Sequence, residues 1–218
     1  YLEINMPHQV FPLPFMIPFY DFTPTPRWML GLGLTFYDML AWDRNYIDDP
    51  DKHLDRKRWL TKEKALQIEP GLNPHGLKGA YHYYDALNRH PNRSNLEYVL
   101  SAAARGAIVA NYVACADFIL EETAHGKRAV GVIARDMVGG RDFPIRAKVT
   151  VNASGPWGDI VLSKLHQNPV RKLTRSKGIH LLFPRFHKNT TIGLETRSKE
   201  HMFLIPWRNY TLLGTTDT

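Results

Sequence analysis

The chain has 218 residues, of which 44% are hydrophobic, so it is long enough for one generous domain or two small domains with packed cores. Its single cysteine, Cys115, excludes an internal disulfide framework, a Cys-based zinc site and a CxxC redox pair, and no other metal site is expected. The 28 Lys and Arg exceed the 21 Asp and Glu, giving a net charge of +7, which favours anionic partners without choosing among substrate, lipid and nucleic acid.

The N-terminal segment, residues 1–26, carries six prolines among aromatic side chains. This composition predicts an extended, packed connection rather than a regular element. The longest uncharged run, from Ile4 to Tyr20, contains four of these prolines, so no membrane-spanning helix is expected there. No signal-peptide pattern is present, and the start at Tyr1 without a methionine suggests truncation.

Two helices are predicted before the centre of the chain. Apolar spacing from Arg27 to Asp43 favours a largely buried helix. The charged stretch that follows is interpreted as a surface connection into a short helix, which the Thr61 hydroxyl would cap.

The clearest helix signal lies further on, after an aromatic strand expected at residues 79–85. Ser94 and Glu97 have the spacing of a capping box, and Gly106 would end the helix. Its apolar stripe is expected to be buried. That stripe consists of Leu96, Val99, Leu100 and Ala103.

The second half of the chain is predicted to consist mainly of strands, with a short helix after the Gly155-Pro156 turn. The expected strands are 111–120, 129–135, 143–152, 179–183, 202–205 and 211–213. The first three form an antiparallel meander because turn residues separate them. The fold class is therefore predicted to be α+β.

Charge is concentrated between Lys164 and Lys199, where nine basic residues face one acid, Glu195. This segment either meets a negative ligand or is a solvated face, and charge alone does not decide. Gly31-Leu-Gly33 resembles the opening of a dinucleotide fingerprint, but Phe36 stands at the third glycine position and no β-branched strand precedes it, so we reject that interpretation. No other generic catalytic motif names a reaction.

Three longer stretches carry a more specific signal: Val151–Trp157, Ser176–Leu182 and Ile205–Asp217. They resemble, in order and spacing, the aerobic FAD-dependent glycerol-3-phosphate dehydrogenases of the D-amino-acid-oxidase-like superfamily. Tyr1–Glu3, Gly33–Asp38 and Tyr83–Asp85 add weaker support, so the resemblance covers essentially the whole chain.

The resemblance implies an FAD-binding domain, here a three-stranded meander plus helix, interleaved with an antiparallel-sheet substrate cap domain. Residues 92–162 would belong to the FAD domain, and 1–91 and 163–218 to the cap. Val113 would meet the adenine at a strand end. The small-residue turn of Ala153, Ser154 and Gly155 would approach the dinucleotide, although an ordinary strand-to-helix connection remains the alternative.

The resemblance also implies substrate-handling residues. His180 matches the histidine of the family's Lys-Gly-x-His strand and is the expected general base for alcohol oxidation; by itself, a strand histidine would more often be structural. The expected substrate-binding residues are Tyr1, Lys177, Arg175, Thr215 and Thr216. Arg175 could equally be a solvated arginine, and the threonines could be plain hairpin residues.

The whole enzyme is expected to oxidise sn-glycerol 3-phosphate to dihydroxyacetone phosphate, in glycerol metabolism, and to pass electrons to quinone. The resemblance places it in the cytoplasm, peripheral on the inner face of the cell membrane, and allows a homodimer. The glycine-rich FAD loop would lie before Tyr1 and further phosphate-binding residues beyond Thr218. In addition, Glu3 and Ile4 are adjacent where the family has a helix. This internal piece alone is therefore expected neither to retain FAD nor to turn over.

Three alternatives belong to other classes. An oxygen-using glycerol-3-phosphate oxidase shares these motifs and is not separated from the dehydrogenase. An FAD-dependent amine or amino-acid oxidase is disfavoured by the basic segment. A non-enzymatic membrane or nucleic-acid binding module is disfavoured because the aromatics of residues 11–37 lie apart from the basic residues; no nucleic acid partner is expected.

Overall fold

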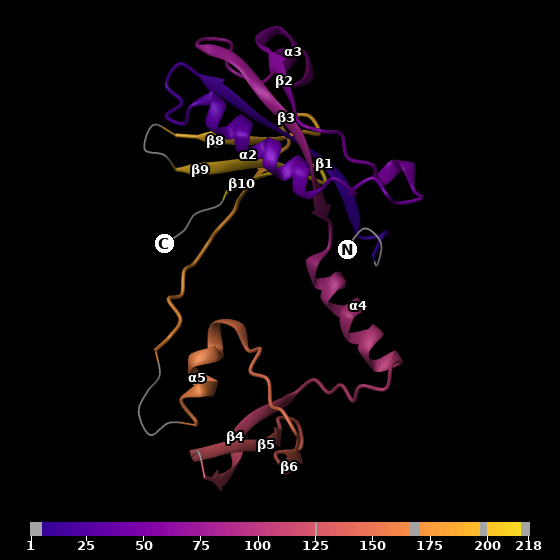
Figure 1. The fold of residues 1–218 in the computed structure, drawn as a ribbon, viewed down its shortest axis with the longest axis vertical. Coiled ribbons are helices and arrows are strands. Elements are labelled where there is room, and N and C mark those ends of the chain that lie inside the picture. The colour runs from indigo at the N-terminus through magenta and orange to yellow at the C-terminus, as the bar shows by residue number, and fades with distance from the viewer. Residues whose placement is uncertain (1–5, 125, 166–170, 197–199, 215–218) are drawn as a thin grey trace. The chain divides into compact units, whose positions relative to one another are not determined.

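The computed structural model describes residues 6–124, 126–165, 171–196 and 200–214. It divides into two compact units, the first formed by 1–98 with 177–218 and the second by 99–176 (Figure 1). These units do not test which segments belong to the FAD half and which to the cap, so that assignment stays a prediction.

The first unit is built on a seven-stranded sheet in the order β2-β3-β1-β8-β9-β10-β7. Its strands are β1 (Val10–Tyr20), β2 (Arg58–Thr61), β3 (Leu77–Asn88), β7 (Leu181–Pro184), β8 (Thr191–Glu195), β9 (His201–Trp207) and β10 (Tyr210–Gly214). Neighbouring strands pair antiparallel except β1 and β8, which pair parallel. The antiparallel sheet expected from the segments 1–91 and 163–218 is thus confirmed, apart from one parallel pair, and its role as a substrate cap stays a prediction.

The prediction of an irregular N-terminal segment is wrong, because β1 is a long strand near the middle of the sheet. Three of its residues, Pro12, Pro14 and Pro18, lack an N–H group, yet β1 pairs along its whole length with β3. The three prolines all stand at even-numbered positions. The odd-numbered residues of β1 therefore supply the N–H groups that donate hydrogen bonds to β3. On the other side β8 pairs with β1 only at Phe15 and Met16. This arrangement tolerates prolines that a fully paired central strand would exclude.

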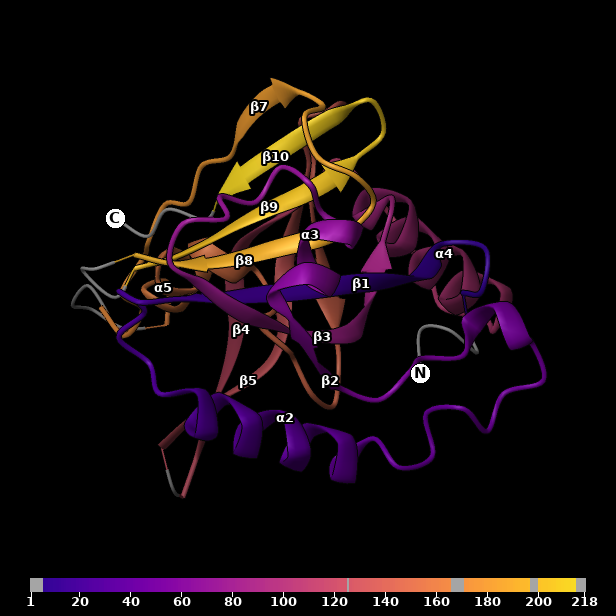
Figure 2. The ribbon, with the colours of Figure 1, turned by 90° about the horizontal axis from the view of Figure 1, so that it is seen from above.

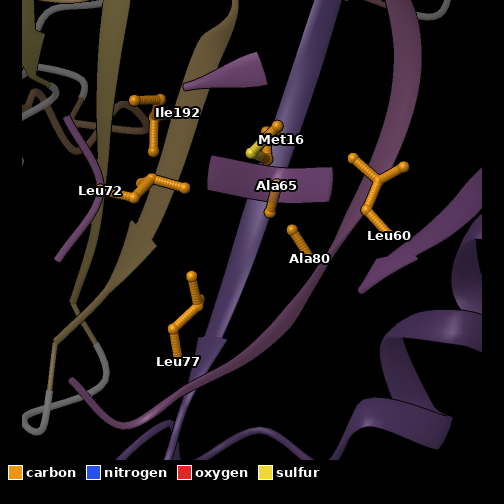
Figure 3. Packing of buried hydrophobic residues seen from close by; sticks show 7 residues of the cluster. All are labelled: Met16, Leu60, Ala65, Leu72, Leu77, Ala80 and Ile192. Atoms are coloured by element: carbon orange, nitrogen blue, oxygen red, sulfur yellow. The ribbon is translucent and has the colours of Figure 1, made fainter. Parts of the chain in front are cut away.

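Two helices cover opposite faces of this sheet, α2 (Arg27–Leu40) and α3 (Lys62–Ile68) (Figure 2). On the α3 face seven buried side chains point toward one another (Figure 3). They are Met16, Leu60, Ala65, Leu72, Leu77, Ala80 and Ile192. On the α2 face Phe19, Leu34 and Tyr81 form a smaller cluster. The Thr61 cap of α3 is confirmed, since its hydroxyl accepts a hydrogen bond from the Lys64 amide.

Helix α2 forms where it was predicted, but it is not largely buried. Only Gly31 and Leu34 are buried, whereas Trp28 and Phe36 are more than 60% exposed. Gly31 has a packing role, because a Cβ there would collide with the Tyr81 hydroxyl. The absence of a Cβ at Gly31 lets α2 lie close to β3.

Helix α4 (Pro91–Ala104) begins three residues earlier than the predicted capping box. Pro91 suits the first helical position, where no N–H partner is needed. Ser94 is buried inside the helix and donates its hydroxyl hydrogen to Asn88 Oδ1 at 3.0 Å, so it is not the cap. The expected buried stripe is also wrong, because Leu96, Val99, Leu100 and Ala103 are all exposed. Gly106, at φ +90°, lies just beyond the helix end, as predicted.

The second unit contains a three-stranded antiparallel sheet in the order β4-β5-β6. The strands are β4 (Val113–Thr123), β5 (Gly126–Asp136) and β6 (Asp142–Arg146), so the predicted meander is confirmed, although the third strand ends before the alternating residues 147–151. After it come the 3-10 helix η2 (Gly155–Trp157) and α5 (Gly158–Leu162). Charged residues 43–57 include the 3-10 helix η1 (Pro50–Lys52), and the short strands β2 and β8 were not predicted.

Candidate functional site

A hollow of about 600 Å³ lies in the second unit, on its small sheet. Most of its wall is apolar, from side chains of β4, β5 and β6 and from the segment that follows β6. Residues from the predicted adenine strand and dinucleotide turn line it together: Val113, Asn152, Ala153 and Ser154. The structure therefore brings most of the predicted cofactor residues to one cavity.

The 152–158 turn is held by the amide side chain of Asn152. Asn152 Oδ1 accepts hydrogen bonds from the Ser154 hydroxyl at 2.6 Å and the Ser154 amide at 3.3 Å, while its Nδ2 donates to the Gly158 carbonyl at 3.0 Å. These three bonds organise the turn locally, as Asn side chains often do. Gly155 does not line the hollow, but it has φ +56°, and a Cβ there would meet nothing within 4 Å. The backbone at Gly155 is thus open to close approach.

Asp159 fixes the segment after α5. It is 6% exposed, and its carboxylate accepts hydrogen bonds from the Lys172 and Leu173 amides at 3.0–3.2 Å. Residues 171–173 have no regular structure, so this anchoring positions them against the helix that follows the turn.

Among the lining residues that were not predicted to belong to a site, Thr150 and Cys115 carry a hydroxyl and a thiol. The Thr150 hydroxyl is buried and has no hydrogen-bond partner in the described part of the chain, although it lines the cavity. An unpartnered buried hydroxyl is unfavourable unless a ligand or water satisfies it. Cys115 also lines the hollow; burial raises the pKa of its thiol, so it stays protonated there. The sequence offered one sign of a site at Thr150, which is a polar residue within an alternating apolar run.

An apolar cavity with one orphaned hydroxyl and an open glycine turn fits part of a dinucleotide such as FAD. Val113 and its neighbours would contact the flat base, and the Ala153–Gly155 backbone would lie next to it. The described residues of this unit hold no glycine-rich phosphate loop.

His180, the expected general base, precedes β7 in the first unit and is exposed. Strand β7 pairs with β10 so that Leu181 lies opposite Leu213, and the His180 ring packs over the buried Gly214. A Cβ built on Gly214 would lie 2.6 Å from Cδ2, 3.0 Å from Nε2 and 3.1 Å from Cγ of His180. The missing side chain at 214 therefore leaves the space that the imidazole fills.

The other predicted substrate-binding residues fall into two groups. Tyr1, Thr215 and Thr216 lie outside the described residues. Lys177 and Arg175 are exposed in irregular chain before β7, and the division of the molecule falls between them. Their roles in substrate binding stay predictions.

Another residue of the family resemblance, Tyr83 of the first unit, has a strongly shifted pKa. Tyr83 stacks on Phe15 with ring centroids 5.2 Å apart, and burial, aided by Asp85, raises its pKa to about 12. Tyr83 therefore remains a neutral phenol at physiological pH.

Comparison with known proteins gives a consistent result. The family model described as "FAD dependent oxidoreductase" matches residues 28–218. The mitochondrial glycerol-3-phosphate dehydrogenase of Mus musculus is 34% identical over all of this chain, and that of Mycobacterium leprae is 33% identical over 97% of it. The solved structure of the Bacillus halodurans glycerol-3-phosphate dehydrogenase, complexed with FAD, matches the whole chain with TM-score 0.69 and 26% identity.

The chain spans only part of each of these proteins. It covers 29% of the mouse enzyme, 34% of the mycobacterial enzyme and 36% of the solved Bacillus chain. In the described part of the chain, no helix is long and apolar enough to cross a membrane.

Proposed function

Because this chain belongs to the FAD dependent oxidoreductase family, we propose that it forms part of an FAD-dependent glycerol-3-phosphate dehydrogenase. The identity of about one third to such dehydrogenases along the whole chain supports the substrate. The cavity that gathers Val113 with the Asn152–Ser154 turn is the observation that carries the proposal, because it offers an FAD family member a place for the base of its cofactor.

In the proposed reaction, sn-glycerol 3-phosphate loses two electrons and two protons to become dihydroxyacetone phosphate. His180 accepts the proton of the C2 hydroxyl, while the C2 hydrogen leaves with its electron pair. Bound FAD supplies the acceptor for that hydride. Lys177, together with Tyr1, Thr215 and Thr216, would bind the substrate, and Arg175 would add positive potential.

Electron transfer to quinone, a peripheral position on the inner face of the cell membrane, and a homodimer belong to the same proposal. Oxygen as the acceptor is the second candidate, since the motifs of this chain do not separate a dehydrogenase from an oxidase. The chain by itself is also proposed to need the rest of such an enzyme for FAD retention and turnover, because its described residues contain no phosphate loop.

The role of His180 can be tested through its neighbour. A methyl group at Gly214 would displace the imidazole, since the three nearest atoms all belong to that ring. In the FAD-loaded protein that carries this chain, Gly214→Ala is expected to lower kcat by about ten- to a hundredfold, because small misplacements of a catalytic group are costly. His180→Ala should lower it about 10²–10⁴-fold.

Gly33→Ala is the matched control, because a Cβ there meets nothing within 4 Å. It should leave kcat unchanged. Full activity of both His180→Ala and Gly214→Ala would remove His180 from the chemistry and leave the family assignment intact.

A further inference from the structure

A second sizeable cavity, of about 550 Å³, lies in the first unit at one end of its sheet. It is formed by the beginning of β1, the end of β3, the β9–β10 turn and residues after β7. Its floor is apolar and its edge is polar. The floor consists of Phe11, Pro12, Leu13, Pro14, Leu87, Pro206 and Trp207, and the edge of Arg89, His90, Arg185, Asn189 and Arg208.

The polar edge is basic, with three arginines and a histidine and no acidic residue among the lining side chains. Arg185 is already committed to the fold. Its guanidinium donates to the carbonyls of His187, Lys188 and Arg208 at 2.9–3.2 Å, and also to Asn189. These bonds hold the loop after β7 against the β9–β10 turn.

Arg89 and Arg208 are in a different situation. The Arg89 guanidinium lies 3.8 Å from the centre of the Phe11 ring, and that of Arg208 lies 4.9 Å from the Trp207 ring. Within the described ranges, neither has a carboxylate at salt-bridge distance. Two cations are therefore held in place by aromatic rings, with hydrogen-bond donors left for a ligand.

Arg208 also has an unusual backbone. It is the first residue of the two-residue turn between Trp207 and Tyr210, and its φ is +53°. This left-handed conformation favours glycine, so a long basic side chain is not what the turn itself requires. Non-glycine residues in such conformations are enriched at functional sites.

We propose that this cavity binds a soluble phosphate monoester that carries an apolar group. A phosphate monoester has close to two negative charges at neutral pH, which matches two arginines, and guanidinium groups bind phosphate oxygens through paired hydrogen bonds. The apolar part rests on the proline and aromatic floor. The cavity volume is in the usual range for small-molecule sites.

This site is separate from the proposed catalytic position. Gly214, beneath His180, ends β10, whereas the cavity lies at its beginning beside Tyr210. Four residues of extended strand span about 13 Å. The inference therefore does not depend on the proposed oxidation of glycerol 3-phosphate.

Calorimetric titration of the chain with phenyl phosphate at low salt tests the proposal. Arg89→Gln and Arg208→Gly should each weaken binding at least tenfold. Glycine suits the positive φ at 208, so that variant removes the charge without threatening the turn. Arg56→Gln, a neutralised arginine exposed elsewhere on the first unit, should bind like the parent chain, and so should His180→Ala.

Phenol and inorganic phosphate separate the two halves of the site. Both should bind more weakly than phenyl phosphate, because each lacks one half of the ligand. Equal affinity of phenol, or equal affinity of the two arginine variants and the parent, would overturn the proposal. Binding to phosphatidic acid vesicles with none to phenyl phosphate would overturn it in favour of a lipid headgroup site. If Arg89→Gln does not fold, Arg89→Lys tests the same contact with the charge kept.

Discussion

The two units of this chain differ in how their apolar side chains are used. The first unit encloses a core on its sheet, with side chains such as Met16, Ala65 and Ala80 fully shielded from solvent. In the second unit, Val130 and Ala134 are the buried hydrophobic residues among those described, while Val149 and Val151 are more than 70% exposed. The first unit thus encloses a core of its own in addition to the exposed apolar side chains of α2, whereas the second unit buries few apolar side chains and presents apolar surface around a ligand-sized hollow.

This difference bears on function, because burial of apolar area is the main favourable term in folding. A unit that buries little apolar surface by itself gains more from whatever covers that surface. For the second unit we infer that the cofactor, and the remainder of a longer protein like its relatives, provide that cover. Exposed large apolar patches on a chain usually mark such contacts.

The largest expected effect is in the core of the first unit. Met16→Ala should lower the free energy of unfolding by about 2–5 kcal/mol, because a fully buried side chain is removed and a cavity remains. Denaturant unfolding followed by circular dichroism measures it. Val151→Ala in the second unit should change stability by less than about 0.5 kcal/mol. A similar loss of unfolding free energy in both variants would contradict this difference between the units.

A smaller effect is expected at Asp159, a buried carboxylate of the second unit. Asp159→Ala removes the charged acceptor of the Lys172 and Leu173 amides, so we expect a local cost of about 1–3 kcal/mol. Faster hydrogen exchange in the peptide covering 158–176 would report it. Asp142→Ala breaks only the exposed pair with Arg135 and should accelerate exchange there far less. The reverse order would contradict the assigned role of Asp159.

The smallest expected effect is on the pH dependence of the first unit's stability. Burial, with Arg58 adding to it, lowers the pKa of His82, despite an opposing contribution from Asp55. Burial also lowers the pKa of His187, with Glu69 opposing and Arg185 adding to the shift. A histidine with a lowered pKa in the folded state stabilises the fold above the ordinary pKa near 6.5, and that stability is lost as the pH falls through the folded-state value.

The thermal midpoint of the first unit should therefore fall as the pH is lowered below about 6.5. His82→Phe keeps an aromatic ring without a titrating group, so the acid-side loss should become smaller. An unchanged pH profile in both His82→Phe and His187→Phe would contradict this source of acid sensitivity.

Much of the topology could be predicted from local signals, and the failures have identifiable physical causes. The β4–β6 meander and the Thr61 cap follow from turn glycines and a hydroxyl that act within a few residues. Strand β1 was missed because its prolines argue against a strand, while their shared parity, which makes the strand possible, depends on the partner strands. The burial of α2 and α4 was overestimated because an apolar stripe does not say whether its covering partner is present.

The candidate site could likewise be predicted only in part. The small-residue turn at Ala153–Gly155 was recognisable from its motif, and Asn152 organises it as such residues do. The packing of His180 over Gly214 could not be predicted, because it requires the register between β7 and β10. The basic cavity around Arg89 and Arg208 was also invisible, since its residues come from distant parts of the chain.

The most direct test of the central claim is anaerobic reduction of the flavin in the purified protein that carries this chain. Flavin absorbance near its visible maximum is followed after addition of glycerol 3-phosphate, so the result does not depend on whether quinone or oxygen is the later acceptor. We expect rapid bleaching with glycerol 3-phosphate, slow bleaching in His180→Ala, and none with D-alanine or L-proline. Bleaching by an amino acid but not by glycerol 3-phosphate would contradict the proposed substrate.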